Sequence, residues 1–83
     1  MSKVTPVVEY IVAEGAWRYM GSNGRFIISP STDSYTLNYS ADGATWEAWG
    51  EATPANDPLM VQEAVTGMFF KLVGNTKKVA VTY

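Results

Sequence analysis

The chain has 83 residues, which is enough for one domain with a small hydrophobic core. It contains no cysteine and no histidine, so disulfides, thiolate or imidazole metal sites and histidine-based catalysis are excluded. Its formal net charge is −2 and its six basic residues are spread along the chain, a distribution that provides no electrostatic footprint for nucleic acid.

The first predicted strand covers residues 3–12. Its side chains alternate, and Val8, Tyr10 and Val12 share one face. Pro6 cannot donate a backbone hydrogen bond to a neighbouring strand. We therefore expect this segment to lie at a sheet edge, or its pairing to begin after the proline.

The next two predicted strands are joined by a tight turn. Residues 16–20 form one strand, in which Trp17 and Tyr19 lie on the same side. Residues 21–24 include two glycines and connect this strand to a return strand over residues 25–29.

A β-hairpin is predicted in the middle of the chain. Residues 35–39 alternate between apolar and polar side chains, and an Asp42-Gly43 pair follows, where glycine supplies a positive φ. Asp42 is expected to form the turn by bonding its own backbone, because no nearby acidic cluster could complete a calcium site. Alternation on the return arm places Trp46 and Trp49 on opposite faces, so one tryptophan is expected in the core and the other on the surface.

The second half of the chain continues as strands over residues 59–64, 68–73 and 79–83, separated by turn residues. No segment keeps a helical period over ten positions. Short strands punctuated by Gly, Pro, Asn and Asp are typical of a sandwich or a barrel. We predict an all-β fold: one domain over residues 1–83, a small antiparallel β-sandwich of jelly-roll type with about seven or eight strands.

The sequence also limits location and partners. No apolar run approaches the roughly 20 residues needed to span a bilayer, and the first residues lack the apolar core of a signal peptide. The glycines form no phosphate-binding or dinucleotide-binding motif. We therefore expect synthesis in the cytoplasm, no membrane or nucleic-acid partner and no cofactor.

Catalysis is not expected. The chain has eight acidic residues, and a glycosidase would need two carboxyl groups about 5–9.5 Å apart in a cleft. A sandwich of this size has little room for a cleft. We predict that the protein is not an enzyme and has no catalytic or metal-binding residues.

Three aromatic residues are candidate contact residues: Trp17, Trp49 and Phe69. Phe69 and Trp49 are out of phase with the apolar side chains beside them. Exposed aromatic rings can stack on sugars, and aromatic residues are also enriched in the cores of protein interfaces. The three residues are therefore candidates for either a subunit interface or a glycan site.

Two local resemblances involve the hairpin and a late strand. The run Tyr39-Ser40-Ala41-Asp42-Gly43-Ala44-Thr45-Trp46 is similar to a hairpin of discoidin-like modules, and it resembles a sialidase Asp-box shortened by one residue. The run Val65-Thr66-Gly67-Met68-Phe69-Phe70-Lys71-Leu72 is similar to a late strand of discoidin domains. These resemblances imply a hairpin shape and not a sugar or lipid site.

The chain is short, lacks Cys and His, has turn-rich strands, and contains the segments Tyr-Ser-Ala-Asp-Gly (residues 39–43) and Gly-Met-Phe-Phe-Lys-Leu-Val-Gly-Asn-Thr (residues 67–76). In these features it resembles the small all-β accessory proteins of tailed-bacteriophage virions, such as capsid decoration or cement proteins and short fibre or tail modules. This resemblance implies a homo-oligomer, most often a trimer, that binds capsid or tail proteins. It also implies assembly in the host cytoplasm followed by a place in the virion. The alternative is a small carbohydrate-binding module that uses its exposed aromatic rings.

Overall fold

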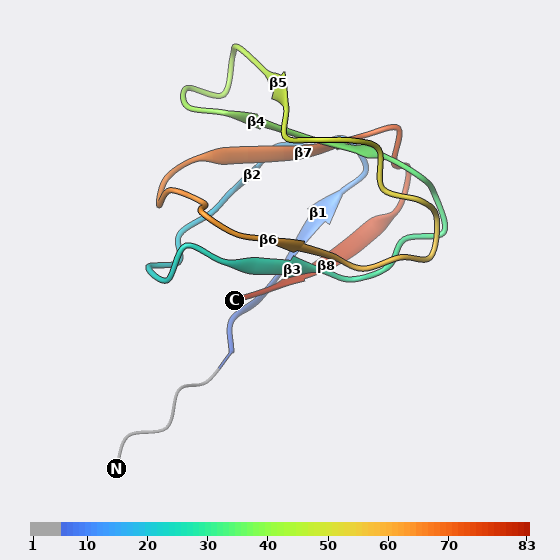
Figure 1. The fold of residues 1–83 in the computed structure, drawn as a ribbon, viewed down its shortest axis with the longest axis horizontal. Helices are drawn as coiled ribbons and strands as arrows, with labels where there is room; N and C mark the ends of the chain where they lie inside the picture. Colours follow the sequence, from blue (N-terminus) through green and yellow to red (C-terminus); the bar gives the residue numbers. More distant parts are fainter. Residues whose placement is uncertain (1–5) are drawn as a thin grey trace.

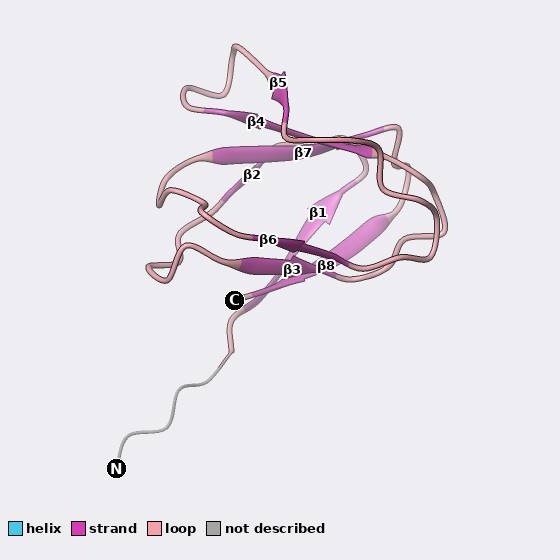
Figure 2. Ribbon diagram, in the orientation of Figure 1, coloured by secondary structure: helices cyan, strands magenta, loops and turns pink. Residues whose placement is uncertain are grey.

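Within residues 6–83, eight short strands form two four-stranded antiparallel sheets (Figure 1). The computed structural model describes residues 6–83, so residues 3–5 of the predicted first strand lie outside the described part. Residues 6–83 contain no helix (Figure 2). The strands are β1 (Val8–Val12), β2 (Trp17–Arg18), β3 (Phe26–Ile28), β4 (Thr36–Ser40), β5 (Glu47–Ala48), β6 (Leu59–Val61), β7 (Phe69–Val73) and β8 (Lys78–Thr82).

The strand order is that of a jelly roll. One sheet has the order β1-β8-β3-β6 and the other β2-β7-β4-β5. The first strand therefore pairs with the last, the second with the seventh, the third with the sixth and the fourth with the fifth. This is one long hairpin rolled into two layers. The prediction of a small all-β sandwich with about seven or eight strands is confirmed.

The core lies between the two sheets and follows from the alternation of each strand. In β7, Phe70 and Leu72 are buried while Phe69 and Lys71 lie on the other face. The centre of the core is aromatic, with the ring centroids of Phe26 and Phe70 4.8 Å apart. The buried apolar residues are Ile11, Trp17, Tyr19, Phe26, Ile28, Tyr35, Leu37, Val61, Ala64, Phe70, Leu72, Val79 and Val81.

Several strands are shorter than predicted, and the largest differences after β1 are in β6 and β2. The strand predicted over residues 59–64 ends at Val61, and Glu63 adopts a φ of 63°, a left-handed conformation that is incompatible with an extended ladder. The strand predicted over residues 16–20 keeps only Trp17 and Arg18 in the ladder, although the amide of Tyr19 still donates to the carbonyl of Met68. The left-handed conformation of Glu63 therefore accounts for the early end of β6.

A buried asparagine joins three loops at one end of the sandwich. Asn75 is 1% exposed. Its amide nitrogen donates to the carbonyls of Ala13 (3.2 Å) and Lys77 (2.7 Å). Its side-chain oxygen accepts from the Ser31 hydroxyl (2.8 Å) and the Lys77 amide (3.3 Å). Since a buried amide is costly unless it is satisfied, this network fixes the relative positions of the loops.

Two buried tyrosines differ in how their hydroxyls are satisfied. The Tyr35 hydroxyl is buried, and no group in residues 6–83 meets the geometric requirements of a hydrogen bond to it, although Thr53 is near enough to influence its pKa. Burial raises that pKa above its ordinary value. The Tyr19 hydroxyl, in contrast, donates to Asn23 (2.8 Å) and accepts from the Arg25 amide (3.1 Å).

We expect Tyr35→Phe to leave the free energy of unfolding unchanged or to raise it by up to about 1 kcal/mol, because it removes a buried hydroxyl that has no hydrogen-bond partner among residues 6–83. Tyr19→Phe is the matched control and should lower the same free energy by about 0.5–1.5 kcal/mol, because a buried hydroxyl loses two hydrogen bonds. Asn23 and the Arg25 amide keep their bond to each other. Urea unfolding followed by fluorescence measures both. Equal destabilisation by the two variants would contradict this account.

Candidate functional site

Trp17 is a core residue and not a surface contact. It is 7% exposed and lies against Phe26, with ring centroids 4.9 Å apart. Its indole nitrogen donates to the carboxylate of Glu9 (2.9 Å), which links β2 of one sheet to β1 of the other. The expectation that Trp17 offers an exposed ring is therefore corrected: the pairing of β2 with β7 turns this side chain inward.

Trp49 is half-buried and packs on the core. Its ring meets Tyr39 edge to face, with centroids 5.2 Å apart, and lies 5.6 Å from Phe70. One side of this arrangement borders an open groove of about 670 Å³. We call it the Trp49 groove, and its lining residues are Tyr39, Ala48, Trp49, Met60, Gln62, Glu63 and Met68.

Phe69 and Trp46 lie on the outer face of the β2-β7-β4-β5 sheet, each beside a cation. The guanidinium carbon of Arg18 is 5.5 Å from the Phe69 ring centroid, and the Lys71 ammonium is 4.4 Å from the Trp46 ring centroid. Both aromatic residues are half-buried. The two predicted hairpin tryptophans thus face opposite ways, with Trp49 on the core side and Trp46 outside, and neither is fully exposed.

The turn between β4 and β5 is built by Asp42 and its neighbours. The Asp42 carboxylate accepts from the amides of Ala44 (2.8 Å) and Thr45 (3.0 Å) and from the Ser40 hydroxyl (2.9 Å). Gly43 has a φ of 80°, a conformation that suits glycine. The amides of Thr45 and Ala44, followed by the Ser40 hydroxyl, lower the pKa of Asp42 to about 2. Every contact of this carboxylate serves the turn.

We predict that the protein loses stability as the pH falls from about 5 towards about 2. The folded-state pKa of Asp42 lies below its ordinary 3.8, so its stabilising contribution is present above that value and is lost as the pH falls. The Thr76 hydroxyl and then the Thr76 amide lower the pKa of Asp33 in the same direction. In urea unfolding across this range, Asp42→Asn should show a shallower pH dependence than the wild type. An unchanged slope would contradict the assignment.

The outer face of the β1-β8-β3-β6 sheet is apolar. The ladder aligns Val8, Thr82, Ile27 and Met60 in one row across all four strands. Lys78 is the charged residue of β8 on this side, and its ammonium lies 4.4 Å from the Tyr10 ring centroid. We call this surface the apolar face. Its exposed large side chains are Val8 (54% exposed), Tyr10 (51%), Val12 (60%), Ile27 (44%) and Met60 (57%).

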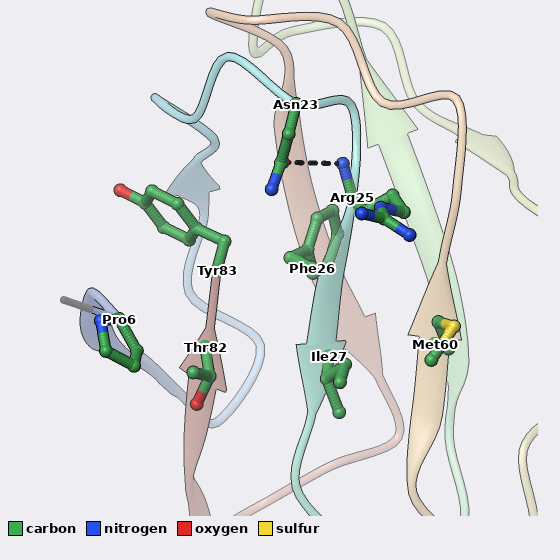
Figure 3. A pocket seen from close by; sticks show the side chains of 8 residues that line it. All are labelled: Pro6, Asn23, Arg25, Phe26, Ile27, Met60, Thr82 and Tyr83. Atoms are coloured by element: carbon green, nitrogen blue, oxygen red, sulfur yellow. Dashed lines mark hydrogen bonds between the residues drawn. The ribbon is translucent and has the colours of Figure 1, made fainter. Parts of the chain in front are cut away.

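A shallow hollow of about 230 Å³ adjoins the apolar face (Figure 3). Figure 3 shows Thr82, Ile27 and Met60 side by side on β8, β3 and β6, with Pro6 at one border. Asn23, Arg25, Phe26 and Tyr83 complete the lining. The hollow gives the flat face a recess that a side chain of a partner could fill.

The apolar face was not recognised from the sequence. Alternation places Val8, Tyr10 and Val12 together, but Ile27 and Met60 join them only through the strand register.

Within residues 6–83, no three acidic side chains come together in a way that could hold a metal ion, and no helix could cross a membrane.

No protein-family model, curated protein or solved structure matches this chain.

Proposed function

We propose that the protein is a non-enzymatic structural protein that acts by binding other proteins, as an accessory component of a tailed-bacteriophage particle. It would decorate or cement the capsid, or belong to the tail or a fibre. Its partners would be further copies of this chain, which the resemblance suggests form a trimer, and capsid or tail proteins. It would be made in the host cytoplasm and then enter the virion.

The apolar face is the observation that carries this proposal. A large exposed apolar patch on a small protein marks a surface that binds a partner, because leaving it in water is unfavourable. A partner that binds this face of the folded protein and not the unfolded chain would also raise the free energy of unfolding. The jelly-roll topology is found in viral capsid and lectin domains, which supports the proposal by analogy.

The direct experiment concerns the particle. The gene should lie among genes for capsid and tail proteins, and mass spectrometry of purified particles should detect the chain in many copies. Ile27→Lys, on the apolar face, should reduce its retention on particles. Val65→Lys replaces a similarly exposed aliphatic residue in the loop after β6, away from this face, and should not. Absence of the chain from particles, or equal retention of both variants, would contradict the proposal.

A carbohydrate-binding module is the second candidate, and the Trp49 groove favours it. The groove combines two aromatic residues, Trp49 and Tyr39, with the polar side chains of Gln62 and Glu63. An aromatic surface with a few polar groups suits a sugar ring. Titration with glycans, followed by tryptophan fluorescence, should show saturable binding that Trp49→Ala abolishes. Binding to particles that glycans do not change would support the first proposal and contradict the carbohydrate-binding alternative.

A further inference from the structure

The free side of β1 carries backbone groups that no other strand of residues 6–83 pairs. β1 is an edge strand with one neighbour, β8. Val7 and Tyr83 exchange two backbone hydrogen bonds, and in an antiparallel ladder this pattern repeats every second residue. The amides and carbonyls of Glu9 and Ile11 therefore face β8, whereas those of Val8, Tyr10 and Val12 face away. Among residues 6–83, one backbone hydrogen bond is made on this side of β1, from the Gly15 amide to the Val12 carbonyl.

β1 is also the longest edge strand among residues 6–83. It has five residues, whereas the other edge strands, β2, β5 and β6, have two or three. Natural sheets protect their edges with charges, prolines or bulges. The exposed row of β1 is Val8, Tyr10 and Val12, which contains no charge. Its one charged residue, Glu9, is half-buried and bonded to the Trp17 indole.

We propose that β1 pairs antiparallel with β1 of a second copy about a two-fold axis through Tyr10. This assignment rests on the self-association in the proposed function and replaces the trimer that the resemblance suggests with a dimer. Each Tyr10 amide would donate to the Tyr10 carbonyl of the other copy. Val8 would lie opposite Val12 and Glu9 opposite Ile11, so no like charges meet across the axis.

The second copy is the occupant that fits this edge best. The strand Val-Glu-Tyr-Ile-Val has valine at both ends and tyrosine at its centre, so it is complementary to itself when reversed. Pairing would join two four-stranded sheets into one of eight strands. The two apolar faces would become continuous and offer a larger surface to a capsid or tail protein. A two-fold axis relates copies in pairs, so this geometry yields a dimer and not a trimer.

A charge exchange at residue 10 tests the axis. Tyr10→Glu and Tyr10→Lys each place like charges opposite one another in the dimer and should each weaken self-association about tenfold or more. An equimolar mixture should regain dimers that contain one copy of each, measured by native mass spectrometry. Residue 10 is half-exposed, so both variants should keep the β-type circular dichroism of the wild type. A monomeric wild type, unaffected single variants, a trimer, or no rescue in the mixture would each overturn the proposal.

Two further variants separate edge pairing from face packing. Met60→Glu lies on the apolar face at the opposite edge of the sheet and should leave the dimer intact. Loss of association in Met60→Glu would overturn edge pairing while leaving the proposed function in place. Tyr10→Cys adds the chain's only cysteine and should oxidise to a covalent dimer, since paired Cα atoms about 5.5 Å apart suit a disulfide. Met60→Cys should remain single chains.

Discussion

Replacing Phe70 with alanine is expected to lower the free energy of unfolding by about 3–5 kcal/mol. The Phe70 ring is fully buried and contacts the rings of Trp17, Phe26 and Trp49 from both sheets. A protein of this length has a total stability of about 4–12 kcal/mol. Phe70→Ala should therefore be close to unfolded at 37 °C, as thermal denaturation followed by circular dichroism would show.

The adjacent residue provides a matched control. Phe69 is in the same strand but lies half-buried on the outer face, beside Arg18. Phe69→Ala removes the same number of atoms, yet it leaves a gap at the surface and not a cavity in the core. Phe69→Ala should lower the free energy of unfolding by about 1 kcal/mol or less. If the two variants were equally unstable, the assignment of inner and outer faces on β7 would be wrong.

Asn75→Ala is expected to lower the free energy of unfolding by about 2–4 kcal/mol. It removes four hydrogen bonds, and the Ala13 carbonyl and the Lys77 amide lose the partner that Asn75 provides. The Ser31 hydroxyl loses its acceptor, whereas the Lys77 carbonyl keeps its bond from the Ala13 amide. Urea unfolding measures the loss. Gln62→Ala removes a similar amide group from an exposed position and should change stability by less than about 0.5 kcal/mol. A loss for Asn75→Ala no larger than that of the control would contradict the proposed role of the network.

Much of the fold could be predicted because alternation is a local property. The separation of Ile11 from Val8, Tyr10 and Val12 requires only a period of two. The Asp42-Gly43 turn also follows from local chemistry, since a short carboxylate and a residue that tolerates a positive φ suffice.

The position of Trp17 could not be predicted in the same way. Alternation groups Trp17 with Tyr19 but does not say which face of a strand is covered. Its burial depends on the pairing of β2 with β7 and on Glu9, eight residues earlier, reaching across from the other sheet. Asn75 likewise appeared as an ordinary turn residue, because its partners Ala13 and Ser31 are remote in sequence.

The apolar face shows the same limit. Ile27 and Met60 each lie in a short strand, and a single exposed apolar residue does not by itself indicate a binding surface. The register that places them beside Thr82 and Val8 turns separate residues into one surface. The candidate contact site therefore moves from the aromatic residues Trp17, Trp49 and Phe69 to the opposite sheet. Trp49 remains a candidate contact residue in the carbohydrate-binding alternative, because it lines the Trp49 groove.

Sedimentation equilibrium of the wild-type chain at several micromolar concentrations tests the self-association of this protein most directly. Copies that pair through β1 should give an average mass that rises with concentration from one chain towards two chains. A mass that stays at one chain over the whole range would contradict self-association.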